Sequence, residues 1–278
     1  MKALYDKVSI ETSKITTKSY STSFSLGIKF LDRDIQNPIY AIYGFVRIAD
    51  EIVDTFHDYN KRELLEEFRK DTFKAIEQGI STNPILNSFQ WVVNKYNMPH
   101  ELIHTFLNSM EMDLGDVVYD QSTYEKYILG SAEVVGLMCL CVFVNGDTKM
   151  YEALKPQAMK LGSAFQKINF LRDINADYHT LGRTYFPGVD LTAFDETVKQ
   201  QIIADIEKDF EEGYRGILQL PKNARFGVYV AYIYYYRLLV KIKQTNSEEL
   251  FKKRIRIPNN QKYALFVKSL VRHNFNML

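Results

Sequence analysis

The stretch "RIADEIVD", residues 47–54, places carboxylates inside a run that otherwise builds a hydrophobic helix. Asp50 and Asp54 are four residues apart, a spacing that puts two side chains on one helix face roughly 6 Å from each other. Like charges at this spacing destabilise a helix, and burial adds a further desolvation cost for each ion. The stretch therefore predicts a mostly buried helix whose carboxylates face a cation.

A second acidic cluster lies in "QKINFLRDINAD", residues 166–177. Asn169, Asp173 and Asp177 follow at four-residue spacing, with Gln166 one turn earlier on the same side. Mg²⁺, with Mn²⁺ as a substitute, takes a few carboxylates together with water and substrate phosphates. Solvated charges on an outer helix face are the alternative interpretation, which the apolar neighbours of both clusters disfavour.

An arginine accompanies each cluster. Arg47 precedes the first pair of aspartates and Arg172 precedes Asp173. A guanidinium binds phosphate oxygens through a bidentate fork, although either arginine could instead form an ion pair within its own helix. Carboxylates, a hard divalent cation and arginines together indicate a site for diphosphate.

The periodicity of the chain predicts an all-α fold, because apolar residues recur at three- and four-residue spacing without sustained alternation. No linker, low-complexity tract or charge block divides the sequence, so we expect one domain over residues 1–278. The predicted helices span residues 10–28, 38–56, 61–78, 83–96, 99–115, 123–144, 147–177, 194–218, 224–243 and 260–276.

The overall charge is nearly balanced, with 35 Lys and Arg against 34 Asp and Glu. This balance and the lack of a basic stripe disfavour nucleic-acid binding. Cys139 and Cys141 lack the further ligands of a zinc site and are expected to be buried thiols in a reducing compartment. The first 25 residues hold no continuous apolar stretch, so we expect a cytoplasmic protein.

The motifs resemble those of the squalene and phytoene synthases, head-to-head prenyl transferases of the all-α isoprenoid synthase fold. Both acidic motifs are similar to those of this family. So are the Ser/Phe-rich segment "YSTSFSLGIKFL" (20–31), the central-helix segment "YILGSAEVVGLM" (127–138) and the flap "GRTYFP" (182–187). The resemblance runs from about residue 15 to 270 and implies a helical bundle around a central hydrophobic cavity.

The resemblance also implies roles for individual residues. The implied Mg²⁺ ligands are Asp50, Asp54, Asn169, Asp173 and Asp177. The implied contacts to the substrate diphosphates are Ser21, Ser23, Arg47, Gln166, Arg172, Arg183 and Arg254. Tyr127 matches a tyrosine implicated in carbocation or proton handling, and Tyr185 and Tyr236 match aromatic positions near the reacting carbons.

Two segments depart from the family pattern. Where many members read His-Ser-Lys-Ser-Phe, residues 20–24 read Tyr-Ser-Thr-Ser-Phe and lose a lysine. Where members usually read Ala-Gly-Thr-Val-Gly, residues 132–136 read Ala-Glu-Val-Val-Gly. Glu133 is therefore either a polar group facing the site or a structural partner of a base.

The reaction implied by the resemblance is the condensation of two geranylgeranyl diphosphates to phytoene through prephytoene diphosphate, with release of pyrophosphate, in carotenoid biosynthesis. A squalene or dehydrosqualene synthase that uses C15 substrates is the alternative, and only squalene formation would need NADPH. A non-catalytic assembly factor is disfavoured because both acidic motifs are intact. The apolar product implies peripheral membrane contact for its release.

Overall fold

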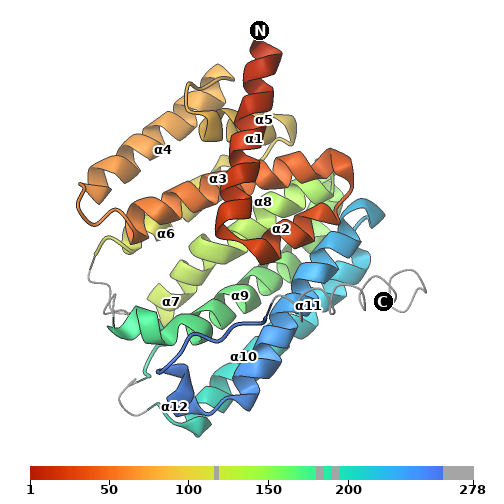
Figure 1. Ribbon diagram of the computed structural model, residues 1–278. Helices are drawn as coiled ribbons and strands as arrows, with labels where there is room; N and C mark the ends of the chain where they lie inside the picture. The colour runs from red at the N-terminus through yellow and green to blue at the C-terminus, as the bar shows by residue number, and fades with distance from the viewer. Residues whose placement is uncertain (116–118, 180–184, 190–193, 259–278) are drawn as a thin grey trace.

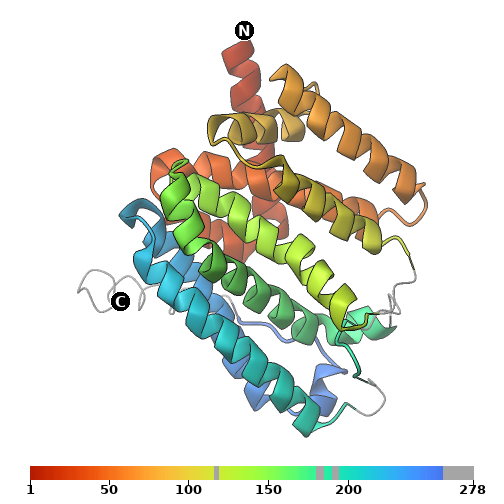
Figure 2. The same ribbon diagram turned by 180° about the vertical axis from the view of Figure 1, so that it is seen from behind.

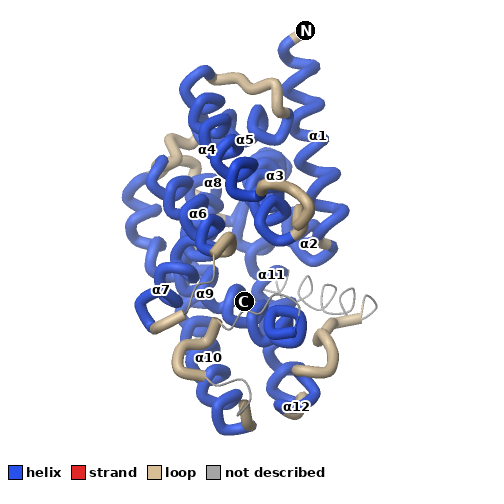
Figure 3. The backbone as a smooth tube through the Cα atoms, turned by 90° about the vertical axis from the view of Figure 1, so that its left-hand side faces the viewer, coloured by secondary structure: helices blue, strands red, loops and turns tan. Residues whose placement is uncertain are grey.

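A computed structural model describes residues 1–115, 119–179, 185–189 and 194–258; the side chains of residues 176–179 are also outside the described part. Every regular element within these ranges is helical (Figures 1 and 3), as the periodicity predicts. The helices are α1 (Lys2–Tyr20), α2 (Thr22–Lys29), α3 (Arg33–Asp54), α4 (Lys61–Gln78), α5 (Pro84–Lys95), α6 (His100–Met112), α7 (Gln121–Ile128), η1 (Leu129–Glu133), α8 (Val134–Phe143), α9 (Thr148–His179), α10 (Glu196–Gln219), α11 (Lys222–Gln244) and α12 (Ser247–Leu250).

The N-terminal region differs from the predicted single helix over residues 10–28. The chain breaks at Ser21, whose backbone is extended and whose hydroxyl accepts the Phe24 N–H at 3.2 Å as the N-cap of α2. Helix α1 begins at Lys2, earlier than predicted, and its buried face carries the hydroxyl residues Ser9, Ser13 and Thr17 instead of apolar ones. Hydrophobic periodicity cannot detect such a face.

Two hydrophobic clusters form the core. One joins α3, α4, α5, α6 and α8, and at its centre the Phe45 and Phe89 rings stack with centroids 3.9 Å apart. The other joins α7, α9, α10 and α11, including Tyr127, Phe170 and Tyr235. The central helix formed by α7, η1 and α8 contributes to both clusters, and it runs alongside α9 in the view from behind (Figure 2).

The central helix and α9 approach each other closely at two glycines. A Cβ on Gly162 would lie 2.7 Å from the Ala132 carbonyl oxygen, and one on Gly136 would lie 3.0 Å from the Ala158 carbonyl oxygen. The central helix widens into a π-helical turn, η1, at this crossing. Such turns often accompany functional sites, because they re-aim the side chains that follow.

Residues 121–143 are long and apolar enough, by length and composition alone, to span a membrane. Half of the most apolar window is buried inside the protein. The central position of this helix between the two clusters accounts for its apolar composition. The predicted helix over residues 260–276 lies outside the described residues.

Candidate active site

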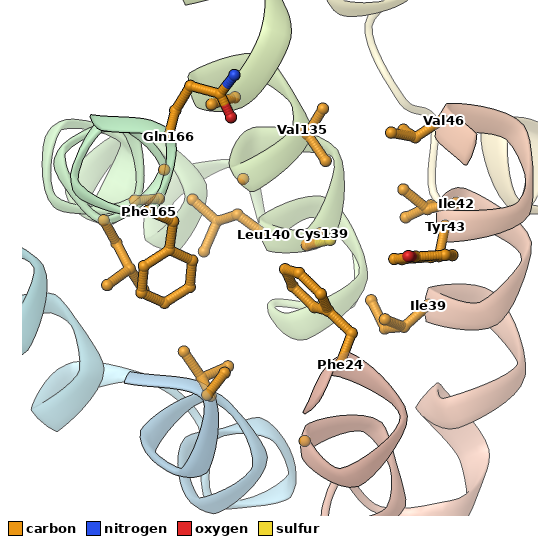
Figure 4. A pocket seen from close by; sticks show the side chains of 18 of the residues that line it. Phe24, Ile39, Ile42, Tyr43, Val46, Val135, Cys139, Leu140, Phe165 and Gln166 are labelled. Atoms are coloured by element: carbon orange, nitrogen blue, oxygen red, sulfur yellow. The ribbon is translucent and has the colours of Figure 1, made fainter. Parts of the chain in front are cut away.

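A cavity of about 350 Å³ lies between α2, α3, the central helix, α9, α10 and α11. Figure 4 shows apolar side chains of α3, including Ile39 and Val46, directed towards Val135 and Cys139 of α8. The Phe24 ring enters from α2. Burial raises the pKa of the Cys139 thiol to about 12, so this cysteine is a neutral part of the wall.

The α3 motif places charged groups at this cavity. Arg47 and Asp50 both line it, and the Arg47 Nη1 donates to Asp50 Oδ2 at 2.5 Å. The other Arg47 amino group pairs with Glu51, which is buried. The Tyr20 ring packs against the guanidinium, with its centroid 4.2 Å from Arg47 Cζ. One arginine therefore bridges two carboxylates, and Asp54 lies half-buried one turn further along α3.

The α9 motif reaches the same cavity from another side. Gln166 and Asn169 line it. Asp173, one turn beyond Asn169, accepts from Arg172 Nε at 3.0 Å and Nη2 at 2.5 Å. Arg254, in the chain after α12, approaches Asp173 with its Nε at 2.7 Å and its Nη2 at 3.2 Å. The structure therefore joins the α9 motif to Arg254, whose predicted contact with the diphosphates stays a prediction.

Two predicted site residues are outside the described part of the structure. Asp177 belongs to α9, but its side chain is among those not described, and Arg183 lies in an undescribed segment. Among the described residues, no three His, Cys, Asp or Glu side chains are grouped closely enough to hold a metal ion. The described carboxylates are instead divided between α3 and α9, with arginines beside them.

The serines of the first family segment are placed beside the cavity. Ser21 caps α2, and Ser23 lies half-buried within that helix. Neither is among the side chains that form the cavity wall, to which α2 contributes Phe24 instead. Their predicted contact with diphosphate therefore stays a prediction.

Tyr127 is brought to the cavity, as expected from the resemblance. Its hydroxyl donates to Asp113 Oδ2 at 2.7 Å. Aromatic rings surround it, with the Tyr119 centroid at 5.4 Å and the Tyr185 centroid at 5.2 Å. Tyr185 also stacks on Phe170 at 4.2 Å, but it is not among the side chains that line the cavity, so its predicted place near the reacting carbons stays a prediction. Sequence reasoning missed Asp113.

Tyr236 lies on the outer side of α11, and 42% of it is exposed. The adjacent Tyr235 is the one that lines the cavity, where its ring stacks on Phe165 at 4.0 Å. The Tyr235 hydroxyl also donates to Asn169 Oδ1 at 3.4 Å. The structure thus corrects the sequence-based assignment by one residue, because neighbouring positions on a helix point about 100° apart.

Glu133 turns away from the cavity, towards α9 and α10. Burial raises the pKa of its carboxyl to about 7, against the opposing effect of the Lys160 ammonium. The half-exposed Lys160 itself pairs at 2.9 Å with the buried Asp209, which also pairs with the buried Lys167. Of the two interpretations of Glu133, the structure favours a structural partner of a base.

The comparisons with known proteins agree with this geometry. A family model described as squalene/phytoene synthase matches residues 17–261. The chain belongs to the squalene/phytoene synthase family. Its members are head-to-head isoprenoid synthases that act on prenyl diphosphates.

Several family members are similar over much of the chain. A phytoene synthase from Arthrospira platensis is 25% identical, with the match covering 91% of this chain and 90% of that enzyme. A 4,4'-diapophytoene synthase from Staphylococcus haemolyticus is 28% identical, with the match covering 68% of this chain and 65% of that enzyme. A solved dehydrosqualene synthase shares the fold, with a TM-score of 0.83 at 22% identity, covering 97% of this chain and 98% of that one.

Proposed function

We propose that this protein condenses two geranylgeranyl diphosphates head to head, through prephytoene diphosphate, to give phytoene and pyrophosphate. One observation carries the proposal: Arg47 and Asp50 of α3 and Gln166 and Asn169 of α9 line a single cavity whose remaining wall is mostly apolar. A diphosphate needs the polar residues, and a prenyl chain needs the apolar wall.

The donor types of the two motifs fit a hard divalent cation. Mg²⁺ would be held by Asp50, Asp54, Asn169, Asp173 and Asp177, whose oxygens are the ligands that this ion prefers. When bound, the metal neutralises the charge of the diphosphate leaving group. The arginines beside these carboxylates then gain phosphate oxygens as alternative partners, which suit a guanidinium fork.

The apolar wall supplies the second requirement of the reaction. When the C–O bond of one substrate breaks, the bonding electrons leave with pyrophosphate and an allylic cation remains. The double bond of the second molecule captures this cation, and loss of a proton closes a cyclopropane ring. Aromatic faces at Phe24, Phe165 and Tyr235 line the cavity, where they exclude water and favour positive charge.

The C20 substrate is supported by the extent of the sequence matches to characterised relatives. Matches to phytoene synthases extend over 91% and 94% of this chain, whereas the match to the diapophytoene synthase covers 68%. A C15 substrate is the second candidate, favoured by the 28% identity to that diapophytoene synthase.

The test is to incubate the purified protein with Mg²⁺ and either geranylgeranyl or farnesyl diphosphate, with and without NADPH, and to identify the extracted hydrocarbon by mass spectrometry. Reactions containing EDTA are the control for the metal. We expect a C40 hydrocarbon from the C20 substrate without NADPH. A C30 product alone would transfer the assignment to the second candidate. Failure of both substrates to release pyrophosphate would overturn the proposal.

A further inference from the structure

Asp113 is a buried carboxylate that neither acidic motif includes. It caps the C-terminus of α6, is 8% exposed, and accepts the Tyr127 hydroxyl proton at 2.7 Å. Tyr127 comes from α7 and is 4% exposed. A buried carboxylate requires a strong hydrogen-bond partner, and the phenol supplies one.

This hydrogen bond decides which hydrogen-bonding groups of the Tyr127 hydroxyl stay available to a substrate. A tyrosine hydroxyl has one proton to donate and lone pairs to accept with. Because Asp113 takes the proton, the lone pairs are left as the reactive feature of Tyr127, a residue of the cavity wall. Burial, with Asp113 contributing further, raises the pKa of Tyr127 well above its usual range, so the hydroxyl is a neutral phenol.

The surrounding rings hold the phenol in one orientation. Tyr119 lies edge-on to it, Tyr185 stacks alongside it, and the Phe170 centroid is 6.0 Å from its own. A carbocation in the cavity is a very strong acid at the carbon next to the charge. An oriented, water-free oxygen acceptor is what proton removal from such a carbon requires.

We propose that Asp113 is a positioning residue that orients Tyr127 for the proton handling implied for this tyrosine by the family resemblance, a role that rests on the proposed function. In the resulting step, Tyr127 accepts the proton lost from a substrate carbocation. The C–H bond next to the cationic carbon breaks, and its electron pair forms the new carbon–carbon bond. The proton goes to the phenol oxygen while the phenol's own proton passes to the Asp113 carboxylate. The pair returns this proton to water after product leaves. Asp113 touches no substrate and acts through Tyr127.

The test compares Asp113→Asn and Tyr127→Phe with Tyr124→Phe, a buried tyrosine one turn away on α7 that does not line the cavity. Thermal melting gives the folded fraction of each variant. Mass spectrometry then measures what fraction of the consumed prenyl diphosphate has become hydrocarbon, cyclopropyl diphosphate or the alcohols that form when water captures a cation. Without its acceptor the cation survives until water captures it, so the alcohol fraction should rise while hydrocarbon per folded molecule falls about 100-fold in both variants.

A purely structural hydrogen bond gives a different result. All products of Asp113→Asn would then fall together with its folded fraction, and the division among them would match the wild type, which overturns the proposal. Hydrocarbon formation by folded Tyr127→Phe at the wild-type rate would also overturn it. A wild-type chain that consumes neither prenyl diphosphate overturns the proposed function and the role of this pair together. Unchanged products from Tyr124→Phe are expected throughout.

Discussion

The acidic motifs of α3 and α9 reach one cavity with opposite local charge balances. On α3, a single guanidinium, that of Arg47, bridges the carboxylates of Asp50 and Glu51. On α9, a single carboxylate, that of Asp173, lies between Arg172 and Arg254. Among the described residues, the α3 side thus has carboxylate in excess and the α9 side has guanidinium in excess. From this difference in the described side chains, we expect the carboxylates of α3 to matter most for the metal, and the arginines beside α9 to matter most for the diphosphate.

The largest effect is expected from Asp50→Asn, which removes a carboxylate from the α3 side. Arg47 keeps Glu51 as a partner, so the melting temperature should change little while pyrophosphate release falls about 1,000-fold, because charge neutralisation of the leaving group is lost. The measurement is the initial rate over a Mg²⁺ titration. Asp58→Asn, at an exposed aspartate beyond the motif, is the control. A rate within threefold of wild type would contradict the assignment of α3.

A smaller effect is expected on the α9 side from Arg254→Ala. This half-exposed arginine contacts Asp173 through two nitrogens, and its loss should raise KM for the prenyl diphosphate about tenfold with little change in the Mg²⁺ requirement. Steady-state kinetics measure both quantities. Arg256→Ala, at an exposed arginine two residues away, should behave as wild type. A changed Mg²⁺ requirement with unchanged KM would reverse the proposed division between the motifs.

The matched pair Tyr235→Phe and Tyr236→Phe tests the α9 side more finely. Tyr235→Phe removes the hydrogen bond to Asn169, and the kcat of this variant should fall about three- to tenfold, as expected for the loss of one neutral hydrogen bond. The exposed Tyr236 should tolerate the change. Equal kcat values for the two variants would remove Tyr235 from the support of Asn169.

The features of this site that can be predicted from the sequence are those that depend on residues close together in the chain. The helices that carry Asp50 and Asn169 can be predicted from the spacing of apolar residues within each segment, and both predicted helices agree with the structure. The choice between Tyr235 and Tyr236 cannot be predicted in this way, because three consecutive tyrosines give no preferred face. That choice depends on the rotation of α11, which packs against α2 where a Cβ on Gly227 would lie 2.9 Å from the Gly27 carbonyl oxygen.

Two other features depend on contacts that no local pattern records. Asp113 pairs with a residue 14 positions later, across the end of one helix and the body of another. The break at Ser21 depends on a capping hydroxyl within a run rich in hydroxyl residues, where a cap and a polar helix face look alike. Both would need the packing of α1, α6 and α7 to be known beforehand.

The smallest predicted effect concerns Glu133, which lies away from both motifs. Its carboxyl binds a proton up to a pH of about 7 in the folded protein but only to about 4.5 when unfolded. Between these values the folded state holds more protons, so stability falls as the pH rises through this window. Glu133→Gln should remove that loss. Compared with wild type, the free energy of unfolding of the variant should gain about 1–2 kcal/mol more at pH 8.5 than at pH 5, after allowance for solvent screening.

Urea unfolding at the two pH values measures the effect of Glu133→Gln, and pyrophosphate release should be nearly unchanged because this side chain does not line the cavity. An equal gain at both pH values would show that the carboxyl does not titrate in this window. A large loss of activity would return Glu133 to the site.

A crystal structure of the protein with Mn²⁺ and an unreactive prenyl thiodiphosphate would show directly whether the two motifs bind metal and diphosphate together, because the anomalous signal locates the metal. We expect metal ions on Asp50 and Asp54, the diphosphate between them and the Asn169 and arginine side chains of α9, and the prenyl chain in the apolar cavity. A diphosphate bound outside this cavity, or metal ions that leave Asp50 paired only with Arg47, would contradict this expectation.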